Sequence, residues 1–140
     1  MSRMVQGVAA VLHKQMQGKP AKFGAPGPLP CSEDAAIVYK RARVGEVQAL
    51  WIEADRVHWI GILDQEPPAL ALAPKRLTVD IETVVRELIG GGRLVGVPAL
   101  TGARAEREDG CMVLEGWTVS RMELLTPEAA PWPGLELNLR

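Results

Sequence analysis

The residue types that most enzymes use for their chemistry are scarce in this sequence. Its 140 residues include two histidines and two cysteines. Structural zinc sites need closely spaced Cys or His ligands, and Cys31 and Cys111 have no such partners nearby. A Ser-His-Asp or Cys-His nucleophile needs a histidine beside its partner, whereas His58 is flanked by Val57 and Trp59 and is interpreted as structural. We therefore expect no catalytic residue, no metal and no cofactor, and a protein that is not an enzyme.

A large excess of one charge and a long apolar run are also absent. The 16 Lys and Arg residues oppose 17 Asp and Glu residues, so any binding to nucleic acid must come from a local basic patch. No stretch approaches the ~20 apolar residues that span a bilayer, and the N-terminus lacks the apolar core and cleavage site of a signal peptide. We expect a cytoplasmic protein without membrane partners, in which residues 1–140 form one domain.

Proline and glycine are concentrated in two segments. Residues 18–34 (GKPAKFGAPGPLPCSED) should form a loop or arm, because proline fixes φ and removes a hydrogen-bond donor while glycine loosens the backbone. Residues 126–140 (TPEAAPWPGLELNLR) should form an irregular tail, with Trp132 either docked or exposed. The sequence thus predicts two Pro-rich arms.

Strand patterns dominate the remainder. Alternating apolar and polar residues predict strands at residues 36–43, 46–53, 56–63, 70–79, 93–101 and 111–125. Residues 1–18 fit a helix or a strand, and the surrounding pattern favours a strand. Turns at Val44-Gly45 and Ala54-Asp55 would join three strands into an antiparallel meander. Gly116 should mark a bulge or bend, and the charged segment 102–110 should be an exposed hairpin tip.

One helix is expected at residues 80–92 (DIETVVRELIGGG). Its apolar residues recur at helical spacing and form one stripe: Ile81, Val84, Val85, Leu88 and Ile89. Asp80 is a suitable N-cap, and the glycines that follow the stripe end the helix. Together, these elements predict a mainly β fold, a small antiparallel barrel with one short helix between strands.

The segment from Asp80 to Leu125 combines a short helix, a glycine stop, a strand, a basic hairpin bounded by glycines and a last strand ending in Leu-Leu. Its pieces read ETVVRELIGGGRLVGVPALTGARAEREDG and CMVLEGWTVSRMELL. In this layout the chain resembles the C-terminal half of bacterial single-stranded DNA-binding proteins with an oligonucleotide-binding (OB) barrel. The resemblance covers about a third of the chain. It implies an OB-like barrel that binds single-stranded DNA rather than RNA.

Binding to single strands without sequence preference requires exposed aromatic rings beside a positively charged groove. The candidates for these contacts are Lys40, Arg41, Arg43, Trp51, Trp59, Lys75, Arg76, Arg104, Arg107 and Trp117. Two alternatives stay open, because the tryptophans could pack in the core and the charge clusters could be solvated surface. Acidic neighbours also dilute the basic hairpin: Glu106, Glu108 and Asp109.

Trp51 and Trp59 both lie in residues 49–62 (ALWIEADRVHWIGI). Whether the two rings can form one stacking surface depends on the register of the two strands. A two-residue turn at Ala54-Asp55 puts the two rings on opposite faces of the sheet, and a three-residue turn that includes Arg56 puts them on one face. Because the turn contains neither Asn-Gly nor Asp-Gly, we expect the longer turn and a shared face.

The sequence therefore predicts a non-enzymatic protein that binds single-stranded nucleic acid and forms homo-oligomers. The alternative is an oligomeric assembly component, of the kind found in phage, secretion or conjugation machinery, that binds no nucleic acid. Its Pro-rich arms would then wrap a neighbouring subunit. A salt titration separates the two, because binding to nucleic acid releases counterions and weakens as salt rises.

Overall fold

The computed structural model describes residues 4–63 and 81–140 and shows a protein built mainly from strands. The strands are β1 (Met4–Val11), β2 (Ala21–Phe23), β3 (Pro26–Tyr39), β4 (Ala42–Glu53), β5 (Arg56–Leu63), β6 (Val95–Thr101), β7 (Arg104–Glu108), β8 (Cys111–Glu115), β9 (Trp117–Leu125) and β10 (Glu136–Leu139). The helices are α1 (Ile81–Gly90) and a 3-10 helix, η3 (Pro127–Ala129). None of the helices in these two ranges could cross a membrane. The strand expected at 70–79, with Lys75 and Arg76, lies outside the described residues.

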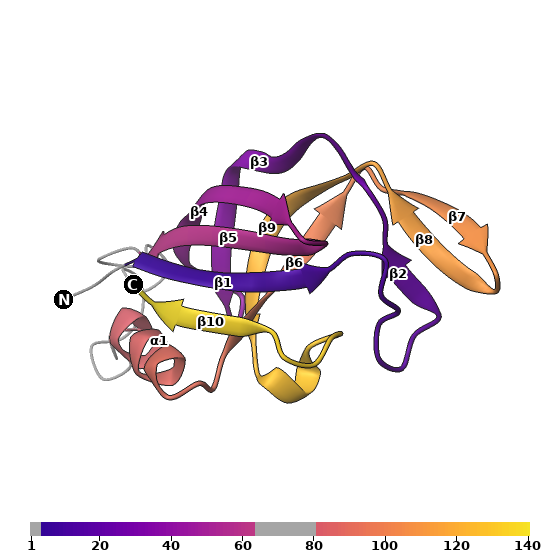
Figure 1. Cartoon of the computed structure of the whole chain (residues 1–140). Coiled ribbons are helices and arrows are strands. Elements are labelled where there is room, and N and C mark those ends of the chain that lie inside the picture. The colour runs from indigo at the N-terminus through magenta and orange to yellow at the C-terminus, as the bar shows by residue number, and fades with distance from the viewer. Residues whose placement is uncertain (1–3, 64–80) are drawn as a thin grey trace.

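Seven strands form one curled sheet in the order β10-β1-β5-β4-β3-β9-β6. The curl brings the edge strand β6 into contact with β1 and β10 at the other end of the sheet, so the sheet wraps around its core as a half-barrel (Figure 1). The predicted mainly β class is thereby confirmed, as is the strand within residues 1–18. The predicted helix is also present between β5 and β6. It packs beside β10, and Val85 and Ile89 of its apolar stripe are buried.

A second sheet, in the order β2-β8-β7, projects from the half-barrel (Figure 1). Strands β7 and β8 form an antiparallel hairpin that turns at Asp109-Gly110, and β2 runs parallel to β8. The segment 102–110 is exposed as expected, but it is not itself the tip of the hairpin, because Arg104–Glu108 form strand β7 and only Asp109-Gly110 form the turn. Gly116, with a φ of 69°, separates β8 from β9, and the bend expected there is present.

Two-residue turns set the register of the long meander. Ala54 and Asp55 have φ of 52° and 60°, and Lys40 and Arg41 have φ of 48° and 68°. Positive φ at both central residues is the type I′ geometry, whose twist matches that of the flanking strands. The expected three-residue turn that included Arg56 is therefore wrong. The turn expected at Val44-Gly45 is also wrong, because both residues lie within β4.

The segment 18–34 does not form an arm, because most of it belongs to β2 and β3. Strand β3 pairs with β9 from Pro26 onward but with β4 only over Ala36–Tyr39, so its first half has one open edge. Pro26, Pro28 and Pro30 lie in this half, where the ladder with β9 is interrupted by a register shift between Pro26 and Cys31. Since proline cannot donate to a ladder, prolines fit an incompletely paired edge of this kind and discourage its pairing with another chain.

The tail, residues 126–140, is also tied to the barrel. Its last part forms β10, which pairs antiparallel with β1, so the expectation of an irregular tail is wrong for Glu136–Leu139. Trp132 is docked with 1% of its surface exposed. Its indole N–H donates to the Lys14 carbonyl at 3.0 Å, and its ring meets Phe23 edge-on with centroids 5.0 Å apart.

The Ala54-Asp55 turn gives the first prediction. A non-glycine residue with positive φ costs about 1–2 kcal/mol, and asparagine tolerates this conformation better than alanine does. We expect Ala54→Asn to raise the free energy of unfolding in urea by roughly 0.5–1 kcal/mol. The matched control is Ala25→Asn, at an exposed residue without positive φ, which should bring no gain. Equal effects of the two changes would contradict the two-residue turn.

Candidate nucleic-acid interface

Most of the tryptophans expected to stack bases are buried. The register pairs Trp51 with His58 and Leu50 with Trp59, so Trp51 and Trp59 point to opposite faces, and the expectation of a shared face is wrong. Trp59 and Trp117 are both 0% exposed and pack in the core, so neither ring can stack on a base, contrary to the prediction. Their large apolar area makes burial the favourable use of these rings.

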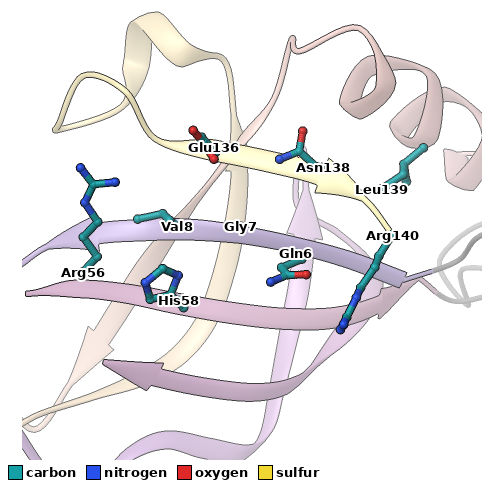
Figure 2. A pocket seen from close by; sticks show the side chains of 9 residues that line it. All are labelled: Gln6, Gly7, Val8, Arg56, His58, Glu136, Asn138, Leu139 and Arg140. Atoms are coloured by element: carbon teal, nitrogen blue, oxygen red, sulfur yellow. The ribbon is translucent and has the colours of Figure 1, made fainter. Parts of the chain in front are cut away.

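Trp51 is the one half-buried tryptophan, on the outer face of the sheet. Its ring stacks on the His58 imidazole with centroids 5.6 Å apart and 12° between the planes. Next to His58 is a shallow depression of about 300 Å³ on the outer face of β10, β1 and β5 (Figure 2). Arg56 and Arg140 lie at its opposite ends, and Glu136 and two amide side chains also line it. With two separated arginines and one glutamate, this lining suits a small polar molecule better than a polyanion.

Within residues 4–63 and 81–140, the predicted basic residues fall in two separate places. Lys40 and Arg41 form the β3–β4 turn and are exposed, and Arg43 follows at the start of β4. Arg104 and Arg107 lie on β7 of the projecting sheet, alternating with acidic residues. The structure therefore does not gather those predicted cations that it describes into one surface, and the β3–β4 turn is the stronger of the two places.

Around that turn runs a surface that we call the basic groove. Two depressions of about 540 Å³ and about 400 Å³ form it, and they adjoin because they share Lys40, Leu124 and Leu125. Its charged lining residues are Lys40, Arg41, Arg93, Arg121 and Glu123. Its other main lining residues are Tyr39, Leu88, Leu94, Leu124 and Leu125. The groove thus combines an apolar floor, one aromatic ring and a rim with an excess of positive charge.

The arrangement of charges within the groove favours an anionic ligand. The one carboxylate among its charged lining residues, Glu123, pairs with Arg121 at 2.9 Å. Both side chains are partly exposed, so the pair contributes about 0–1 kcal/mol and a phosphate can compete for the guanidinium. The ammonium of Lys40 lies 5.5 Å from the Tyr39 ring centroid. A phosphate contact and a stacking surface therefore lie side by side.

Sequence reasoning missed Tyr39, Arg93 and Arg121 as members of this site. Arg121 reaches it because β3 and β9 pair in parallel although they are distant in the chain, and apolar alternation does not reveal such partners. Arg93 follows the glycines that end α1, and its position depends on where the helix docks. Tyr39 gave one usable signal, since it immediately precedes a Lys-Arg turn at the end of a strand.

In the ranges 4–63 and 81–140, no three His, Cys, Asp or Glu side chains gather closely enough to hold a metal ion. No protein-family model matches the chain, and neither a curated protein nor a solved structure is significantly similar to it. The function must therefore be inferred from the chain's own surfaces.

The burial of the tryptophans predicts how their fluorescence responds to iodide, which quenches exposed rings. Because Trp59, Trp117 and Trp132 have 0–1% of their surface exposed, Trp51 should account for most of the quenching. We expect Trp51→Phe to reduce the Stern–Volmer slope by more than half, measured at constant ionic strength. Trp132→Phe is the control, which should lower the total intensity but not the slope. A slope that Trp51→Phe leaves unchanged would contradict the assignment.

The environment of Cys31 predicts slow alkylation. Burial raises the pKa of the Cys31 thiol, and the thiolate is the form that reacts. At pH 8 we expect Cys31, in a Cys111→Ser background, to react with iodoacetamide more slowly than free cysteine. The midpoint of its pH–rate profile should lie above the ordinary thiol pKa of about 8.5. A midpoint at or below that value would contradict the burial.

Proposed function

We propose that this protein binds single-stranded nucleic acid non-enzymatically, and that the basic groove is the binding surface. The observation that carries the proposal is that Lys40, Arg41 and Arg121 line one depression and that Lys40 and Arg93 line the adjoining one, so four cations from three separate segments line the groove. A chain with a net charge of −1 has no general attraction to polyanions, so this local excess is what would attract a phosphate backbone.

The rest of the groove suits the bases of such a strand. Base stacking on an aromatic ring is worth about 1–3 kcal/mol and is independent of sequence. Tyr39 offers such a ring beside Lys40, and the leucines beneath it offer an apolar floor. Because a duplex hides its base faces, this combination favours a single strand. The resemblance to single-stranded DNA-binding proteins supports DNA over RNA.

A second surface ranks lower for this ligand. The depression beside Trp51 and His58 carries two arginines and one glutamate, with Arg56 and Arg140 at opposite ends (Figure 2). Two cations separated in this way, with a carboxylate on the same face, attract a polyanion less than four cations with one paired carboxylate. The alternative function, assembly through Pro-rich arms, has less support because both segments contribute strands to this chain's own sheets.

The test is a fluorescence-anisotropy titration of a labelled oligo-dT of about 16 nucleotides, with an oligo-U of the same length in parallel. We expect binding at about 50 mM salt that weakens steeply toward about 200 mM, because each phosphate contact releases a counterion. The double variant Lys40→Gln/Arg93→Gln should reduce the slope of log K against log salt by about 1.4, since each single-strand contact contributes about 0.7.

The matched control is Lys14→Gln/Lys19→Gln, which removes the same charge at exposed residues that do not line the groove. This control should keep the slope of the unmodified protein. Equal losses in both double variants would indicate a general charge effect and would overturn the assignment of the groove. No anisotropy change at low salt with either oligonucleotide would overturn nucleic-acid binding and leave assembly as the function.

A further inference from the structure

The outer strand of the projecting sheet, β7, has an open edge. In the order β2-β8-β7 it pairs with β8 on one side, and no other described strand pairs with its second side. All five of its residues are exposed, and the sheet stands clear of the half-barrel (Figure 1). An open edge presents a row of backbone N–H and C=O groups that can pair with another strand.

The hydrogen bonds of β8 determine which β7 groups point outward. The Met112 N–H donates to the Pro20 carbonyl and the Leu114 carbonyl accepts from the Gly24 N–H, so these two residues of β8 face the β2 side. Their neighbours therefore face β7, because successive residues of a strand point their backbone groups to opposite sides. The β7 partners of those neighbours are Arg104, Glu106 and Glu108. This leaves Ala105 and Arg107 with outward N–H and C=O groups.

We propose that β7 pairs antiparallel with β7 of a second copy of this chain, around a two-fold axis that passes through Ala105. The two projecting sheets then join into one continuous sheet. In this register Arg104 of each copy lies directly opposite Glu106 of the other. These positions form non-hydrogen-bonded pairs, in which side chains approach most closely, so the interface contains two ion pairs.

The outward pattern and the charges together select this register. An antiparallel ladder matches outward residues with outward residues, so the two-fold axis must pass through a residue rather than between two. An axis through Arg104, Glu106 or Arg107 places that residue opposite its own charge in the second copy. An axis through Ala105 places no like charges opposite each other.

The same charges explain why the partner is a second copy. Charged side chains on an open edge normally prevent pairing, and a strand of one sign would repel itself. The sequence RAERE carries both signs and is complementary to itself when reversed around its alanine. Edge pairing of a few residues buries little surface, so we expect a weak dimer that high salt dissociates. The proposal does not depend on nucleic-acid binding, because the dimer is measured without nucleic acid.

The test is sedimentation velocity at low salt, up to about 500 µM protein, a range suited to a small interface. The unmodified chain should show a monomer–dimer equilibrium. Arg104→Glu and Glu106→Arg should each weaken the homodimer by roughly tenfold or more, because each turns both ion pairs into repulsions. An equimolar mixture of the two variants should dimerise again, because every opposed pair in the heterodimer is then attractive.

The controls separate edge pairing from loss of folding. Lys19→Glu and Glu128→Arg reverse the same charges at exposed residues elsewhere and should leave the dimer unchanged. Ala105→Pro removes one outward donor without a change of charge, and it should abolish the dimer while the circular dichroism melt persists. A monomer at every concentration, or a mixture of the two charge variants that stays monomeric, would overturn the proposal.

A cysteine crosslink tests the position of the axis. In a Cys31→Ser/Cys111→Ser background, Ala105→Cys places two thiols opposite each other in a hydrogen-bonded pair. The expected Cα separation of about 5.5 Å lies within the range for disulfides. We expect oxidation to give a covalent dimer on non-reducing gels. Arg107→Cys, whose register partner is Ala103, should not crosslink, and crosslinking through position 107 instead of 105 would overturn the register.

Discussion

The architecture depends on the burial of Trp59 against the glycine backbone inside the curled sheet. A Cβ on Gly96 of β6 would lie 2.6 Å from Cζ2 of this ring, and one on Gly61 would lie 3.0 Å from Cζ3. The indole Nε1 has no hydrogen-bond partner in the described part of the chain, a cost of about 1–3 kcal/mol. Burying the ring gains roughly 4–6 kcal/mol by its area, so packing outweighs the lost hydrogen bond. Trp59 therefore joins β5 to β6 and cannot serve a ligand.

The basic groove is a consequence of that constraint. Trp59 packs β6 against β5, and β9 lies between β6 and β3 because it pairs with both of them. The parallel pairing of β9 with β3 then carries Arg121 toward the β3–β4 turn, where Lys40 and Arg41 project in a type I′ geometry. Cations that are remote in the sequence thus share a surface because of strand order, and the apolar core supplies its floor through Leu124.

The parts of the fold that follow from local chemistry could be predicted from the sequence. The α1 stripe, the hairpin at 102–110 and the bend at Gly116 each depend on residues close in the chain. Register could not be predicted, because Ala54-Asp55 adopts a turn that normally selects glycine or asparagine, and strand twist overrides that preference. The Pro-rich segment 18–34 was predicted as a loop or arm for a related reason. Proline breaks central strands, but the prolines here lie at an edge of β3 that β4 leaves unpaired. Strand order, on which the groove depends, leaves no local signal at all.

The net charge of this chain is near zero, but its surfaces differ in how their positive and negative side chains are arranged. Near the β3–β4 turn, cations from three segments line two adjoining depressions that hold one paired carboxylate between them, so the field there extends toward any polyanion within a Debye length, about 8 Å at physiological salt. On β7, by contrast, two Arg and two Glu side chains are interspersed along one strand. Their electrostatic fields cancel at a distance, so they act only on a partner that is in direct contact with the strand. Arg104 and Arg107 are therefore poorly suited to attract nucleic acid, although they are basic residues on an exposed hairpin. Pattern, rather than the number of cations, separates a surface that attracts a polyanion from one that selects a complementary strand.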